Sequence, residues 1–164
     1  MQKSNITLII GDNAAGKTRS LYKIYEEKIK DNIIVTNIPD KSIQYEVSED
    51  KEAMLEETDM VEEYKEDNMV NKGMRYILRL LAYKGDILML DNLDRSLTAQ
   101  QVIDISHIIR ENRAMWKEIY ITGYDAKLLV LFDGDEENII VLTENGKKHT
   151  NRYEFIKHID KIRE

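Results

Sequence analysis

Gly11-Asp12-Asn13-Ala14-Ala15-Gly16-Lys17-Thr18 is the stretch that decides the fold. It follows a short apolar run at residues 6–10, which is typical of a buried strand. It precedes residues 18–30, where apolar side chains recur at helical spacing. The stretch satisfies the pattern G-x-x-x-x-G-K-[ST] at every fixed position. Because a strand and a helix stand where this pattern requires them, the sequence predicts a phosphate-binding loop, not an accidental glycine turn before a helix.

The residue types of this loop fit a nucleotide and a metal ion. Glycines let the backbone approach phosphate closely, and successive N–H groups with the helix N-terminus supply positive potential. Lys17 would reach the β- and γ-phosphates, and the Thr18 hydroxyl would bind Mg²⁺. We therefore expect ATP and Mg²⁺ as cofactors. The predicted nucleotide contacts are Gly11, Asp12, Asn13, Ala14, Ala15, Gly16, Lys17, Thr18 and Arg19.

A phosphate-binding loop also needs an acidic residue at the end of a neighbouring strand to orient the metal ion. Residues 86–91 are apolar on both pleat faces, which indicates a central strand covered on both sides, and Asp91 ends it. Asp91 is therefore predicted to hold the metal ion together with Thr18. Asn92 can orient a water molecule but cannot take its proton. Asp94 is the nearby carboxylate for a base, although it could equally cap a helix or pair with Arg95.

Strand-like and helix-like patterns alternate along most of the chain. Strands are expected at residues 6–10, 33–36, 86–91 and 118–122, and helices at residues 18–30, 74–83 and 98–112, the last capped by Thr98. This alternation predicts an α/β fold with a mostly parallel central sheet flanked by helices. Residues 138–143 and 148–151 flank Asn145-Gly146, which predicts a C-terminal antiparallel hairpin, and residues 153–163 predict a terminal helix.

Length and composition limit the class of protein. The 164 residues are expected to form one domain, 1–164, and the absence of cysteine excludes disulfides and thiolate metal sites. The N-terminal apolar run is too short for a membrane span or a signal peptide, so we expect no membrane span and a cytoplasmic protein. A net charge of −7 does not indicate binding of nucleic acid.

Most of the negative charge lies between Glu46 and Asp67. This segment, 46–67, holds eleven acidic residues and two lysines, a net charge of −9, so the rest of the chain is nearly neutral. Its apolar residues recur near helical spacing, which predicts a solvated amphipathic helix. An alternative is an acidic surface that docks a basic protein partner.

Three stretches together resemble the ABC-type ATPases, a class of P-loop NTPases, and in particular the compact head domains of the RecF, structural-maintenance-of-chromosomes and overcoming-lysogenization-defect class. They are the loop at residues 11–18, the run at residues 71–97 and the strand and turn at residues 119–125. The resemblance implies a head-to-tail, nucleotide-dependent dimer or larger assembly. In it Asn71, Gly73 and Arg75 would contact the nucleotide of the other subunit, and Thr122 with Tyr124 would form a switch.

The departures from this family concern the groups that sense or attack the γ-phosphate. Asn71 stands where the family has serine, Asn92 where it has the catalytic glutamate, and Tyr124 where it has the switch histidine. Only Gln44 lies in the region of the family's glutamine loop. The resemblance therefore implies slow or weak ATP hydrolysis, in a nucleotide-dependent switch or an ATPase subunit. A small nucleotide or metabolite kinase and a non-hydrolysing interaction module are the alternatives.

Overall fold

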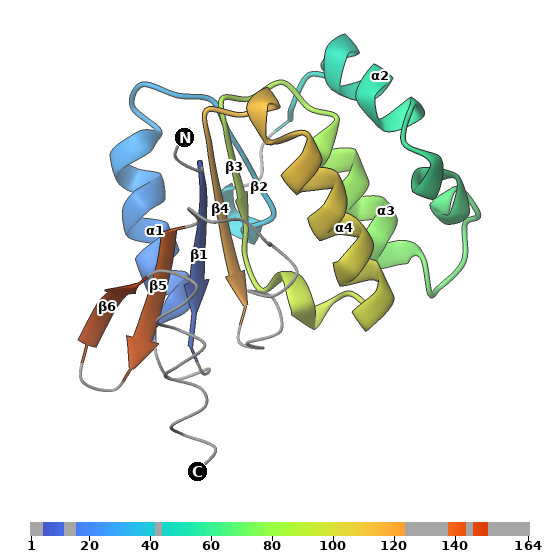
Figure 1. Cartoon of the computed structure of the whole chain (residues 1–164). Coiled ribbons are helices and arrows are strands. Elements are labelled where there is room, and N and C mark those ends of the chain that lie inside the picture. Colours follow the sequence, from blue (N-terminus) through green and yellow to red (C-terminus); the bar gives the residue numbers. More distant parts are fainter. Residues whose placement is uncertain (1–4, 12–15, 42–43, 124–137, 144–145, 151–164) are drawn as a thin grey trace.

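A six-stranded sheet forms the centre of the fold (Figure 1). The structure is a computed structural model that describes residues 5–11, 16–41, 44–123, 138–143 and 146–150. The strands are β1 (Ile6–Ile10), β2 (Ile34–Thr36), β3 (Ile87–Leu90), β4 (Glu118–Gly123), β5 (Asn138–Thr143) and β6 (Gly146–Thr150). They lie in the order β2-β3-β4-β1-β5-β6, with β1 to β5 parallel and β6 antiparallel to β5. The predicted α/β sheet and its C-terminal hairpin are confirmed.

Helices cover both faces of this sheet. Figure 1 shows α1 (Lys17–Lys28) on one face, α3 (Lys72–Leu81) and α4 (Ala99–Glu111) on the other, and α2 (Glu49–Glu56) beyond them. Short 3-10 segments are η1 (Pro39–Lys41), η2 (Asp59–Tyr64), η3 (Leu93–Arg95) and η4 (Arg113–Met115). Across the described ranges, no helix has the length and apolar character needed to cross a lipid bilayer.

Strand β3 explains why the sheet needs helices on both sides. Its side chains are fully buried and alternate between two apolar clusters. Leu88 and Leu90 belong to the cluster under α3 and α4, whereas Ile87 and Met89 pack with Leu21 of α1. This alternation is the two-residue period of a strand with no face left for water. The central position predicted for this strand is confirmed.

The predicted start of α4 at Thr98 is confirmed. The Thr98 hydroxyl accepts a hydrogen bond from the Gln101 N–H at 3.2 Å, and the Gln101 side chain accepts one from the Thr98 N–H at 3.0 Å. This reciprocal capping box begins the helix at the expected residue. Helix α3 begins two residues before the expected Met74. The predicted elements at residues 126–132 and 153–163 lie outside the described residues.

The acidic segment at residues 46–67 is not one solvated helix. It forms α2 and then η2, and it contributes Met54, Leu55 and Tyr64 to the larger apolar cluster. The reason is that its few apolar side chains gather on one side and find α3 and α4 beneath them. Its carboxylates remain exposed. The segment is thus helical and amphipathic, as expected, but it is an acidic layer packed onto the fold and not a single solvated helix.

The buried polar side chains of Lys51 and Tyr64 hold this layer to the rest of the fold. Lys51 is 6% exposed, and its ammonium donates to the carbonyls of Tyr83 at 3.0 Å and Gly85 at 2.9 Å. The same ammonium lies 5.0 Å from the centre of the Trp116 ring. Burial lowers the pKa of Lys51. At the other end, the buried Tyr64 hydroxyl donates to the carboxylate of Asp104 on α4, so both ends of the segment are held to the body.

Candidate functional site

The predicted site residues gather at the carboxyl edge of the parallel strands. Gly11 follows β1, Asn37 follows β2, Asp91 follows β3, and Thr122 lies near the end of β4. Because β2, β3, β4 and β1 are parallel neighbours, these four strand ends meet at one edge of the sheet. Open α/β sheets bind their ligands at this edge.

The predicted phosphate-binding loop is described only at its two ends, Gly11 and residues 16–18. Gly16 has φ 81° and ψ 30°, a left-handed conformation that glycine adopts without strain, and α1 begins at the next residue. The Lys17 ammonium donates to the Gly11 carbonyl, just after β1, at 2.7 Å. Arg19 is exposed on α1. The predicted contacts Asp12, Asn13, Ala14 and Ala15 lie outside the described residues.

The structure brings Thr18 and Asp91 together across 73 residues of chain. The Thr18 hydroxyl lies 3.1 Å from one carboxylate oxygen of Asp91 and 3.4 Å from the other. These are the two residues predicted to hold the metal ion. Among the residues that the structure describes, no group of three His, Cys, Asp or Glu side chains could hold a metal by itself. The pair still fits Mg²⁺, which in nucleotide sites takes one or two protein ligands beside water and phosphate oxygens.

Thr122 holds the other side of Asp91. Its hydroxyl donates to Oδ1 of Asp91 at 2.6 Å and accepts a hydrogen bond from the Asn92 N–H at 2.8 Å. Thr122 is fully buried, so this contact is shielded from water. The predicted switch residue therefore touches the predicted metal ligand. Its predicted companion, Tyr124, lies outside the described residues.

Asn37 is a site residue that the sequence analysis missed. Its Oδ1 accepts a hydrogen bond from the Asp91 N–H at 2.7 Å, and its Nδ2 donates to the Asp91 carbonyl at 2.9 Å. Both backbone groups of Asp91 are thus held by one amide. The available signal was the polar residue directly after the second parallel strand. Asn37, and not the exposed Gln44, is the amide that meets Asp91.

Asn92 has a left-handed backbone conformation, which suits asparagine. Its φ of 50° and ψ of 48° are left-handed, and it is the sole non-glycine residue with positive φ in the described ranges. Asparagine adopts this region more readily than most residues, including glutamate. Asp94 follows in η3 and is half-buried. A base role for Asp94 stays a prediction.

Asn71, Gly73 and Arg75 are engaged within their own chain. The buried Asn71 amide donates to the Glu66 carbonyl at 3.0 Å, and Arg75 pairs with Asp67 at 2.6 Å. A Cβ on Gly73 would overlap the carbonyl oxygen of Ser96, a backbone atom next to η3. These contacts within the chain explain why an asparagine, a glycine and an arginine suit these three positions. Their predicted contact with a second subunit stays a prediction.

Solved structures of ABC-type ATP-binding proteins share this fold. A protein assigned as a cobalt-transport ATP-binding protein gives a TM-score of 0.61 at 20% identity, over 92% of this chain and 70% of its own. A transporter assigned to the metal-chelate ABC type gives 0.61 at 15% identity, over 93% of this chain and 75% of its own. The archaeal ribosome recycling factor aABCE1, in complex with the stalk protein aP1, gives a TM-score of 0.59 at 19% identity, over 92% of this chain and 34% of its own.

No protein-family model matches the sequence, and the search of curated proteins found no match. The likeness is therefore one of structure. It shows that the chain has the fold of ABC-type ATP-binding domains. Since one fold hosts many functions, the activity has to be argued from the site itself.

Proposed function

We propose that this chain binds ATP with Mg²⁺ at the carboxyl edge of its sheet and acts as a nucleotide-dependent switch with slow hydrolysis. The observation that carries the proposal is the 3.1 Å contact between the Thr18 hydroxyl and the Asp91 carboxylate. It joins a residue of the predicted phosphate loop to the acidic end of β3, which is separated from β1 by β4, and this is the pairing of groups that phosphoryl chemistry requires. The ABC-type fold supports the same reading.

Each side chain has a distinct role in this proposal. Lys17 and the N-terminus of α1 would neutralise the phosphates, since both present positive charge or potential at the loop. Thr18 and Asp91 would hold Mg²⁺, which draws electrons from the phosphate oxygens when it is bound. Thr122 and Asn37 position Asp91 through its carboxylate and its backbone, respectively.

Slow turnover follows from the residue after Asp91. In hydrolysis a water oxygen bonds to the γ-phosphorus while the bond to the β–γ bridging oxygen breaks, which gives ADP and phosphate. A carboxylate at this position could take the water proton, but the Asn92 amide cannot. The proton would then pass to the phosphate itself or to Asp94. We therefore expect bound ATP to persist long enough to act as a signal.

The switch would work in an assembly. In the proposed head-to-tail dimer, of the RecF, structural-maintenance-of-chromosomes and overcoming-lysogenization-defect kind, the start of α3, with Asn71, Gly73 and Arg75, would face the partner's nucleotide. Gly73 approaches Ser96, just after η3, and only Asn92 separates η3 from Asp91, so a change at the proposed metal site has a short path to the start of α3. The acidic segment at residues 46–67 is the proposed contact for a basic protein partner in the cytoplasm.

Nucleotide binding is tested by Lys17→Ala. We expect loss of Mg²⁺·ATP binding by isothermal titration calorimetry, because the phosphates lose their nearest side-chain cation. Lys23→Ala, on the exposed side of α1, is the matched control and should bind normally. Unchanged ATP affinity in Lys17→Ala would refute the central claim.

Hydrolysis and assembly are tested with two further measurements. Asn92→Glu should raise phosphate release, since it supplies a carboxylate, although the left-handed backbone will cost about 1 kcal/mol of stability. No gain in a folded variant would move the base role to Asp94. Size-exclusion chromatography of the wild type with Mg²⁺·ATP should show a dimer. A monomer that phosphorylates an added nucleotide acceptor would favour the kinase alternative.

A further inference from the structure

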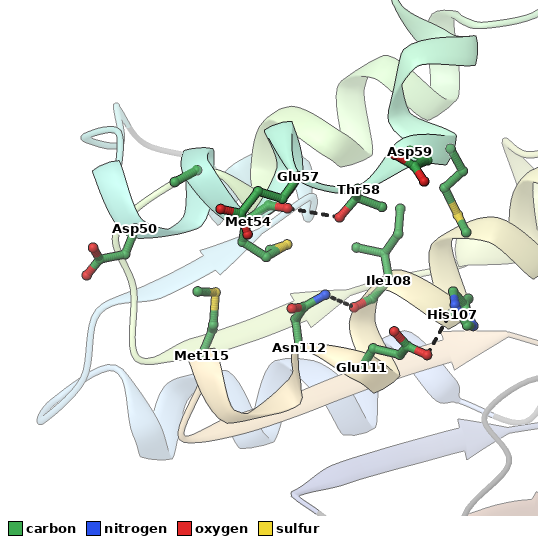
Figure 2. A pocket seen from close by; sticks show the side chains of 12 residues that line it. Asp50, Met54, Glu57, Thr58, Asp59, His107, Ile108, Glu111, Asn112 and Met115 are labelled. Atoms are coloured by element: carbon green, nitrogen blue, oxygen red, sulfur yellow. Dashed lines mark hydrogen bonds and ion pairs between the residues drawn. The ribbon is translucent and has the colours of Figure 1, made fainter.

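A cavity lies between the acidic segment and α4, within the described part of the chain. Its volume is about 550 Å³, and Figure 2 shows α2 and η2 on one side of it and the C-terminal half of α4 on the other. Twelve residues line it: Asp50, Ala53, Met54, Glu57, Thr58, Asp59, Met60, His107, Ile108, Glu111, Asn112 and Met115. None belongs to the proposed nucleotide site.

The floor of this groove is apolar and adaptable. Met54 and Ile108 are buried beneath it, while Met60 and Met115 are half-buried beside them. Figure 2 places Met54 on α2 opposite Ile108 on α4. Methionine is unbranched and polarisable, so such side chains can reshape around an apolar group that enters. The floor therefore suits a large aliphatic or aromatic anchor.

The rim of the groove is negatively charged. Asp50, Glu57, Asp59 and Glu111 are all exposed. Glu111 also lies 3.2 Å from Nε2 of His107. The twelve lining residues include neither lysine nor arginine. A phosphate-bearing ligand such as nucleic acid or an anionic membrane would be repelled here, whereas basic side chains would be attracted.

The two walls are held in place without a partner. Lys51 anchors α2 to the carbonyls of Tyr83 and Gly85, and Tyr64 anchors η2 to Asp104 on α4. The Tyr64 contact joins the acidic segment to α4, which forms the opposite wall, and the Lys51 contacts hold α2 to the turn between α3 and β3. The groove is consequently preformed, which lowers the conformational cost of binding.

We propose that this groove docks a basic amphipathic segment of a partner protein. Its apolar side chain rests on the methionine floor, and its Lys or Arg residues face the carboxylates of the rim. This is helix-in-groove recognition with complementary charge. The inference rests on the proposed function in one respect, the contact of the acidic segment with a basic partner, and this docking requires no nucleotide.

The test uses a fluorescently labelled 18-residue peptide of leucine and lysine at helical spacing. Fluorescence anisotropy should show micromolar binding that weakens as NaCl is raised, because the rim contacts are solvent-exposed. A second peptide, with glutamate in place of lysine, should not bind. Failure of the basic peptide to bind would overturn the proposal.

Matched variants separate the groove from general acidity. Glu57→Lys with Glu111→Lys should weaken peptide binding about tenfold, a few-fold for each reversed rim charge. Glu26→Lys with Glu27→Lys on α1 makes the same change of net charge and should weaken it less than about threefold. An equal loss in both variants would overturn the proposal, since the binding would then be non-specific.

A neutral change tests the floor. Met115→Ser should weaken binding about threefold to tenfold with the salt dependence unchanged, because only apolar contact is lost. Circular dichroism and urea unfolding confirm that each variant is folded. If the wild-type protein self-associates and the Glu57→Lys, Glu111→Lys variant does not, the groove is occupied by a second copy of this chain, and the proposal is overturned. Lys17→Ala should bind the peptide normally, so that failure of the nucleotide site and failure of the groove are told apart.

Discussion

Replacement of Asn37 by alanine should weaken both the fold and the proposed metal site. The variant removes two hydrogen bonds, of 2.7 and 2.9 Å, that hold the backbone N–H and carbonyl of Asp91. Each contributes about 0.5–1.5 kcal/mol net, so the free energy of unfolding should fall by about 1–3 kcal/mol. For a chain of this size, a fall of ~2 kcal/mol lowers Tm by roughly 4–8 °C.

The same variant should lower ATP affinity mainly when Mg²⁺ is present. Without Asn37, Asp91, the proposed metal ligand, is less firmly positioned, and loss of such a supporting contact typically costs about 10–100-fold in metal affinity. Titration calorimetry with ATP, in Mg²⁺ and in EDTA, gives the increase in affinity that Mg²⁺ provides. We expect this increase to shrink about tenfold in Asn37→Ala while binding in EDTA hardly changes.

Asn32→Ala is the matched control. The Asn32 amide also donates to a backbone carbonyl, that of Lys28 at 3.0 Å, but this contact lies at the far end of α1. It should cost about 0.5–1.5 kcal/mol and leave the effect of Mg²⁺ unchanged. If Asn37→Ala lost stability as expected but kept the full Mg²⁺ effect, the reasoning that Asn37 positions the metal ligand would be refuted.

Two further predictions concern stability. Gly73→Ala should lower the free energy of unfolding, measured in urea, by about 1–3 kcal/mol, because the Cβ of the alanine would meet the Ser96 carbonyl oxygen. A variant as stable as the wild type would contradict this close approach. Stability should also fall as pH rises above about 10, since burial and neighbouring carboxylates raise the pKa of Tyr64 and Tyr120 in the folded chain, while unfolded tyrosines ionise near 10. Urea unfolding between pH 9 and 11 measures this fall, and a Tyr64→Phe, Tyr120→Phe variant that declined as steeply would disprove its cause.

Local patterns in the sequence predict the sheet and the loop. The apolar runs that became β1 and β3, the glycine before Lys17 and the capping box at Thr98 each act over a few residues. Strand formation, a left-handed turn and a helix start depend on neighbours along the chain, so a single sequence can reveal them. The pairing of Thr18 with Asp91 also followed, because a loop of this pattern requires an acidic strand end.

Strand order and packing lie beyond such local patterns. Asn37 meets Asp91 because β2 lies next to β3, and nothing near residue 37 states which strand is its neighbour. The acidic segment joins the core because α3 and α4 present an apolar face to it. The groove exists because residues near 54 and 111 come from elements far apart in the chain. The sequence by itself thus predicts the phosphate-binding loop and its acidic counterpart, whereas the contacts that position Asp91 and form the groove arise from long-range packing.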